Sequence, residues 1–411
     1  MAFQQGAFQD PGFQITTQPV GDAGAATFAI NVEAGARVTY GWKTDVLTSL
    51  AGLEQRAATR NRPRQRYEFS TLLSDAQHRR VLSVLAGNAA AAPLFLLGIA
   101  FEDLTVVSST AGSITVSSLV LCDWAVPGQR MIVVAPWGEI GEAVVQSTIG
   151  STIAVNADLT AVAVEGARAM PAMGVFLDPD QALGRHRCNL GRWDLVATAE
   201  RSQYGNFSPV GNGVLLTVYD AMPVWTFGIG SRFAGQPLYS GAELVDLGGR
   251  ISALPAFDQA AWGRAIRLEG KNQIEWQLLK RFLDTIQGRR RKFLLPSGRP
   301  DLTPIGDAST GTLTVEGPPM PDAPDYANHW FPSLAHRRLR LVRTDGAFAF
   351  RKVLAVAAAV GSQDLLLDAP YAGALARVEF LEQVRLESDE VAVTWQGHVF
   401  TVELGARVVQ Q

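Results

Sequence analysis

The sequence predicts a mainly β fold with a minor α component, built from two tandemly duplicated modules. Segments rich in Val, Ile, Thr and Leu alternate with Gly, Asp and Pro about every eight to twelve residues, a spacing typical of small antiparallel domains. A helix-then-strand pattern occurs twice, and its two copies are separated by a constant offset of 198 residues. Each module is therefore expected to be a strand-helix-strand unit followed by a small β-barrel or sandwich.

Each copy opens with a helix start signal. Ser74–Gln77 and Asn272–Glu275 are capping boxes, in which a short polar side chain and a Gln or Glu three residues later bind free backbone donors. Apolar residues at helical spacing follow each box. Gly87 and Gly288 come next, and glycine is the residue that best tolerates the left-handed turn that closes a helix.

The matching pattern continues beyond the helices. Phe95–Leu97 corresponds to Phe293–Leu295, and Asp103–Thr105 corresponds to Asp301–Thr303, both at the offset of 198. The match then thins, although glycine-led strands can still be followed. The alternative is that helix, glycine and strand form a common local sequence that recurs without duplication.

These observations divide the chain into five parts. An extended arm is followed by a first module and its small β-barrel, and then by a second module and its barrel. The predicted boundaries are 1–20 for the arm, 21–105 and 106–205 for the first module and barrel, and 206–305 and 306–411 for the second module and the second barrel with a C-terminal hairpin.

Composition excludes several classes of function. The net charge is −3, whereas nucleic-acid binding as a main task usually requires a basic face. The two cysteines, Cys122 and Cys188, are expected to be reduced core thiols, and the five histidines do not stand at metal-ligand spacing. No basic segment followed by an apolar core marks a signal peptide, and no apolar run is long enough to insert into a membrane.

No catalytic constellation emerges from the sequence. Asp178, Asp180 and Asp194 with His186 do not assemble a nucleophile and an oriented base by spacing. The glycines from Gly228 onward lack the Lys-Ser or Lys-Thr pair of a phosphate loop. The sequence therefore predicts a protein that is not an enzyme and that has no cofactor and no metal site.

Two stretches are candidate interfaces. Phe3, Phe8 and Phe13 recur with a period near five in a segment too short to form a core, which favours an arm that docks on the same or a neighbouring subunit. The alternative is a plain disordered leader. The second stretch, a charged loop, is predicted to face a partner subunit or else to be solvated. Its arginines are Arg56, Arg60, Arg62, Arg64 and Arg66.

A family resemblance rests on a few short motifs. Tyr40–Val46, Gly52–Arg56 with its Glu-Gln-Arg element, Arg62–Arg64 and Tyr67–Phe69 are similar to the opening of the distal tail proteins of long-tailed phages and gene transfer agents. Those relatives usually carry one such module, whereas this chain carries two. The second copy lacks the Glu-Gln-Arg element at Ala256–Ala260.

The resemblance implies a structural virion protein of the phage tail tip, made in the cytoplasm of the bacterial host. It implies a ring, trimeric or hexameric, that joins the tail tube protein to the baseplate hub and fibres. A baseplate hub or adaptor is the alternative within structural proteins. A carbohydrate-binding receptor module, with Trp124, Trp137 and Trp330 stacking on sugars, is the alternative from another class.

Overall fold

The computed structural model describes most of the chain. The described residues are 15–16, 27–29, 35–48, 54–88, 94–119, 122–178, 181–187, 190–200, 216–227, 235–238, 243–246, 251–254, 261–317, 326–332, 336–359 and 361–409. Residues 35–200 are called the first half below, and residues 216–409 the second half. The protein is mainly β, with few helices and a large antiparallel sheet.

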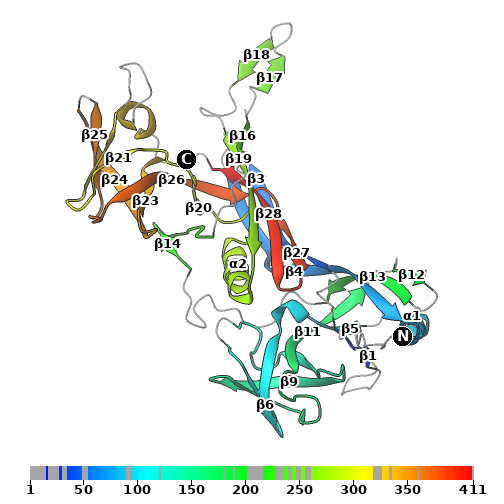
Figure 1. Ribbon diagram of the computed structural model, residues 1–411. Helices are drawn as coiled ribbons and strands as arrows, with labels where there is room; N and C mark the ends of the chain where they lie inside the picture. The colour runs from blue at the N-terminus through cyan, green and yellow to red at the C-terminus, as the bar shows by residue number, and fades with distance from the viewer. Residues whose placement is uncertain are drawn as a thin grey trace, which may run out of the picture.

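A central antiparallel sheet runs through both halves (Figure 1). Its strand order is β12–β13–β4–β3–β27–β28–β19–β16. The first four strands belong to the first half, and the last four to the second half. Their bounds are β3 (Ala36–Thr48), β4 (Glu54–Ser74), β12 (Ala182–Arg187), β13 (Leu190–Ala199), β16 (Gly235–Leu238), β19 (Ala261–Gly270), β27 (Glu390–Gln396) and β28 (Val399–Val408).

A lobe of strands extends from each half (Figure 1). Each lobe consists of six strands. In the first lobe the pairings β6–β7–β10–β9–β8–β11–β6 close on themselves. In the second, β21–β22–β25–β24–β23–β26 pair in sequence, and a bridge between Leu302 and Val378 closes the circle. The bounds are β6 (Leu104–Thr110), β7 (Ser113–Val116), β8 (Arg130–Val134), β9 (Ile140–Ile149), β10 (Thr152–Val155), β11 (Arg168–Leu177), β21 (Pro304–Ile305), β22 (Thr312–Glu316), β23 (Arg338–Arg343), β24 (Phe348–Ala359), β25 (Ser362–Leu367) and β26 (Leu375–Leu386).

Shorter elements complete the described fold. Strand β5 pairs with β11, and β20 pairs with β26. Each lobe joins the central sheet because β11 also pairs with β13, and β26 also pairs with β28. The bounds are β1 (Ile15–Thr16), β2 (Thr27–Ala29), β5 (Leu94–Gly98), η2 (Ala100–Glu102), β14 (Val218–Tyr219), β15 (Met222–Pro223), β17 (Glu243–Asp246), β18 (Ile251–Leu254), β20 (Phe293–Pro296) and η3 (Tyr326–Trp330).

Both predicted helices are present. Helix α1 spans Asp75–Asn88 and α2 spans Gln273–Ile286. The Asn272 side chain accepts a hydrogen bond from the backbone of Glu275, as expected for a helix cap. The helix ends follow the prediction in part. Helix α1 continues through Gly87, whereas α2 ends at Ile286 and is followed by Gln287 and Gly288, which both adopt left-handed φ values, 55° and 64°.

Other local predictions had mixed outcomes. The C-terminal hairpin is confirmed, with β27 and β28 joined through Gln396 and Gly397. The alternating segments Phe28–Val32 and Arg37–Tyr40, separated by Gly35, also predict a hairpin, and this prediction is wrong. The described part of the first segment, β2, pairs in parallel with β5, while β3 pairs with β4 and β27. Long-range strand partners therefore prevailed over the nearest neighbour in sequence.

Three main cores hold these parts together. The largest belongs to the central sheet and helix α2, and it includes residues of both halves; each lobe has its own smaller core. Leu279, Phe282, Leu283 and Ile286 bury one side of α2. The opposite face of the sheet is exposed and polar, with Arg37, Arg66, Arg267 and Glu403 among its side chains.

A tight contact between β19 and β28 gives a test of this packing. A Cβ atom at Gly270 would lie 2.0 Å from the fully buried ring of Phe400. We expect Gly270→Ala to lower the free energy of unfolding by about 1–3 kcal/mol, the usual cost of overpacking a core. Gly41→Ala, where the nearest atom would be 3.7 Å away, is the matched control. Urea unfolding measures both, and equal stabilities would contradict the packing described.

Candidate functional site

The two halves meet first through backbone pairing. Residues Ala36–Gly41 of β3 lie antiparallel to Glu390–Trp395 of β27. The backbone N–H of Trp42 extends the ladder by donating to the carbonyl of Asp389 at 2.9 Å. This pairing makes the sheets of the two halves one continuous sheet, since neither β3 nor β27 is left as an edge.

Asp389, in the turn before β27, fixes the end of this ladder. One carboxylate oxygen accepts from the backbone of Thr44 at 2.8 Å. The other accepts from the Thr44 hydroxyl at 3.0 Å and from the backbone of Arg289, just after α2, at 2.9 Å. A single carboxylate thus links β3 of the first half to the end of α2 in the second half.

A buried ion cluster forms the second part of the contact. Glu102 of η2 is fully buried, and one of its carboxylate oxygens accepts from Trp276 at 3.1 Å and from the Lys280 ammonium at 2.8 Å. The same ammonium lies 3.0 Å from Asp123 of the first lobe. Helix α2 is therefore held to the first half by one cation between two carboxylates. We call the β3–β27 ladder, the Asp389 contacts and this cluster the inter-half joint.

Aromatic rings surround the ion cluster. Phe101, next to Glu102, stacks on Trp395 with ring centroids 4.6 Å apart and meets the edge of Trp276 at 6.4 Å. Trp276 and Trp395 themselves meet at 5.0 Å. Such contacts exclude water, which strengthens the Lys280 ion pairs and makes their loss costly.

The charges in this cluster shift the pKa values of its members. Burial lowers the pKa of Lys280, but Asp123 and Glu102 together more than offset it, so the pKa is raised above its ordinary value. Burial raises the pKa of Asp284, one turn further along α2, to about 7 in spite of Lys280 and Arg62. One oxygen of Asp284 is buried without a hydrogen-bond partner among the described residues.

The predicted arginine cluster lies on a strand and not in a loop. Strand β4 begins at Glu54, and its residues from Glu54 to Phe69 pair with β3. The guanidinium of Arg56 donates to the carbonyl of Arg289 at 3.0 Å, and that of Arg60 donates to Gly41 at 3.0 Å. Arg66 pairs with Glu68 and Asp178. These contacts lie within one chain.

The remaining arginines of the cluster have different surroundings. Arg62 is partly buried near Asp284, whereas Arg64 is exposed. The cluster is thus divided between the inter-half joint and the exposed face of the sheet. Whether Arg64 meets a partner stays a prediction. Phe3, Phe8 and Phe13 lie outside the described residues.

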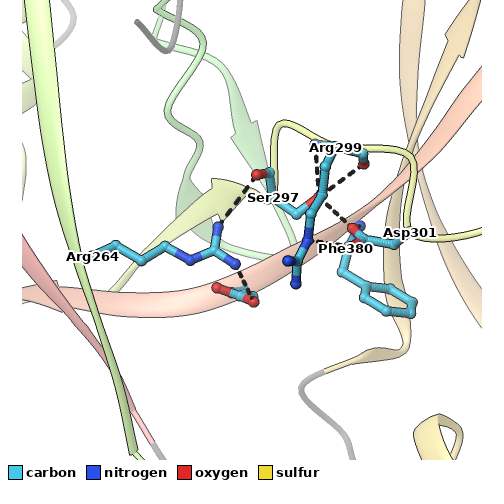
Figure 2. Close-up of polar contacts among 6 residues, drawn as sticks. Arg264, Ser297, Arg299, Asp301 and Phe380 are labelled. Carbon is cyan, nitrogen blue, oxygen red and sulfur yellow. Dashed lines mark hydrogen bonds and ion pairs between the residues drawn. The ribbon is translucent and has the colours of Figure 1, made fainter. Parts of the chain in front are cut away.

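A polar network supports the turn between β20 and β21 in the second half. Figure 2 shows Arg264, which donates to Glu382 at 2.8 Å and to the carbonyl of Ser297 at 3.4 Å. Asp301 accepts from the backbone of Phe380 at 2.8 Å, from the Ser297 hydroxyl and from Arg299 at 3.0 Å. We call Ser297–Asp301 the Arg299 turn.

The network holds the backbone of the Arg299 turn while leaving its tip outside. The side chain of Arg299 is 71% exposed, and Pro300 is exposed as well. Burial raises the pKa of Glu382, although Arg264 opposes the shift. A rigid, solvent-facing turn of this kind can act as a contact surface.

Sequence reasoning did not find the residues of the inter-half joint. Lys280 carried a usable signal, because it lies on the same side of the helical pattern as Trp276 and Leu279, where a charge needs a buried partner. Glu102 and Asp123 gave no comparable local signal. Trp124 is fully buried and donates to the carbonyl of Glu102 at 2.9 Å, so it does not present a ring for sugar stacking.

Cys122 is buried in the first lobe, and burial raises the pKa of its thiol to about 12; Cys188 lies outside the described residues. Among the residues that the structure describes, no group of His, Cys, Asp and Glu side chains could hold a metal ion. Within the described residues, no helix is long and apolar enough to cross a membrane.

In comparisons with known proteins, neither a family model nor a curated protein matches the chain.

Asp284 gives the joint a testable pH dependence. A free aspartate has a pKa of about 3.9, so between about pH 4 and pH 7 the folded protein holds a proton that the unfolded chain has released. Stability therefore falls as pH rises through this window, and the full cost applies above pH 7. We expect Asp284→Asn to be more stable than the native chain at pH 8, by on the order of 1–3 kcal/mol, and nearly equal at pH 4.

Urea unfolding at several pH values measures this difference. Asp45→Asn, at an exposed carboxylate on β3, is the matched control and should keep the pH profile of the native chain. An Asp284→Asn profile that runs parallel to the native one would show that this carboxyl does not cause the pH dependence.

Proposed function

We propose that this protein is a structural component of a phage tail tip, in which a ring of the chain joins the tail tube to the baseplate hub and fibres. The proposal combines the resemblance of Tyr40–Phe69 to distal tail proteins with the way in which the two halves are joined. The proposal depends on two points. The chain is a tandem duplication, and the contact between its two halves is repeated between neighbouring chains.

The order of strand pairing supports the duplication. The pairings β4–β13, β13–β11 and β11–β5 of the first half have the counterparts β19–β28, β28–β26 and β26–β20 in the second half. Each lobe then follows the same circular order of six strands. Helices α1 and α2, both of 14 residues, occupy equivalent places between the second strand and the short buried strand.

The single observation that carries the ring is the position of the unpaired edges. By the same correspondence β3 matches β16, and β27 matches β12. Within the chain β3 pairs with β27, whereas β12 and β16 each have a partner on one side only among the described residues. Pairing β16 of one chain with β12 of the next would repeat the internal contact, and a repeated head-to-tail contact forms a ring when its rotation closes.

Two features refine this picture. Pro237 lies in β16 and has no backbone N–H, so the strand lacks one donor and its ladder would be weaker. The exposed polar face of the central sheet would be shared by all subunits of the ring. Three chains would present six similar modules, which would match a sixfold tube to a threefold hub; a ring of six chains is the competing arrangement.

The alternatives have less support. A baseplate hub or adaptor would use the same ring geometry, and binding partners distinguish it from a ring below the tube. The carbohydrate-binding alternative has less support because Trp124 is buried in the core and cannot stack on a sugar, although Trp137 is 51% exposed. No nucleophile with an oriented base lies in the inter-half joint, where the charged groups bind one another.

The purified chain should assemble, and the assembly should bind tail tube protein. Native mass spectrometry is expected to give three times the mass of the chain, and pull-down with tube protein should retain it. Six chains per ring would contradict the trimer and keep the duplication. A chain that stays monomeric and does not bind tube protein at any concentration would contradict the proposed function.

The N-terminal arm should contribute to assembly. Phe3, Phe8 and Phe13 could each bury roughly 150–250 Å² on docking, which an isolated segment cannot do. Deletion of residues 2–14 should leave a folded subunit that assembles poorly in sedimentation velocity. A chain with all three phenylalanines replaced by Ser should behave in the same way, and normal assembly of both variants would show that the arm is dispensable.

A further inference from the structure

The turn that carries Glu102 has a counterpart in the second half. Ile99 donates its backbone N–H to Pro171 at 2.9 Å, and Ser297 donates in the same way to Phe380 at 2.9 Å. Phe101 and Glu102, two and three positions further along, therefore correspond to Arg299 and Pro300. In the first half this turn is buried against α2, whereas in the second half the Arg299 turn is exposed.

The surface that receives Glu102 also has a counterpart. Lys280 lies at the eighth position of α2, and Leu82 lies at the eighth position of α1. The Lys280 side chain is buried against the first half, but Leu82 is 47% exposed. An apolar side chain is thus exposed on α1 at the point where α2 makes its main contact with the other half.

The two differences complement each other. Where the inter-half joint has Lys280 on a helix and Glu102 on a turn, the exposed counterparts are Leu82 on a helix and Pro300 on a turn. Both partners change from charged to apolar together. A leucine and a proline can remove each other from water, whereas a leucine opposite a carboxylate would leave a charge without a partner.

We propose that the Arg299 turn of one chain docks on helix α1 of a second copy, with Pro300 against Leu82. This inference rests on the duplication and ring of the proposed function and identifies the side chains at the contact between chains. The contact lies beside the β12–β16 pairing, as the ion cluster lies beside the β3–β27 pairing.

The different chemistry of the two contacts makes assembly directional. Glu102 fits Lys280 and not Leu82, and Pro300 fits Leu82 and not Lys280. A first half therefore meets the second half of its own chain through charges, and the second half of a neighbour through apolar groups. Pairing of two first halves would bury Glu102 without a cation, and pairing of two second halves would bury Lys280 without a carboxylate. The desolvation cost of that unpaired charge disfavours both wrong contacts.

A charge exchange tests the contact. Leu82→Lys alone and Pro300→Glu alone should each raise the concentration needed for half-assembly by about tenfold, which corresponds to 1.4 kcal/mol. The double variant should return to within about threefold of the native chain, since it recreates the Lys280–Glu102 pair between chains. Mass photometry across a dilution series measures assembly, and circular dichroism confirms that each exposed substitution leaves the subunit folded.

Ile149→Lys, at a site that is 78% exposed in the first lobe, is the matched control and should assemble normally. Single variants that assemble like the native chain would overturn the contact while leaving the ring intact. If both single variants assemble poorly and the double variant assembles no better than they do, Leu82 and Pro300 do not contact each other. A native chain that stays monomeric would overturn the ring and this contact together.

Discussion

The arrangement of the molecule depends on the pairing of β3 with β27. A strand at the edge of a sheet leaves a row of unpaired backbone donors and acceptors, and it will pair with whatever strand it meets. Here two such edges from different halves satisfy each other over Ala36–Gly41 and Glu390–Trp395. That pairing brings α2 against the first lobe, so the ion cluster and the aromatic rings follow from it.

Backbone pairing does not discriminate between partners, because every strand offers the same groups. Side chains must therefore determine which two halves pair, and in the inter-half joint these side chains are Glu102, Asp123 and Lys280. Burying three charges adds little net stability, since desolvation offsets most of the attraction. Their effect is on specificity: a wrong partner would leave at least one charge buried alone.

Local signals in the sequence were sufficient for the helices and the C-terminal hairpin. Capping at Asn272 and the turn at Gly397 act within a few residues, and the structure has both. The joint could not be found in this way, because Glu102 and Lys280 lie far apart in the chain and meet only after the sheet has formed. The arginines of β4 show the same limit: their density was visible, but strand geometry divides them between the joint and the exposed face of the sheet.

If the chain is a tandem duplication, as we propose, its two modules create a problem that a single module lacks. If the two contacts were alike, a first half could bind any second half, and internal and external contacts would compete during assembly. Helices α1 and α2 keep the same length and position, yet they differ at Leu82 and Lys280, where a contact would be made. The turns opposite differ at Pro300 and Glu102. Divergence at these four positions would let each chain close its internal joint first and leave one defined surface for its neighbour.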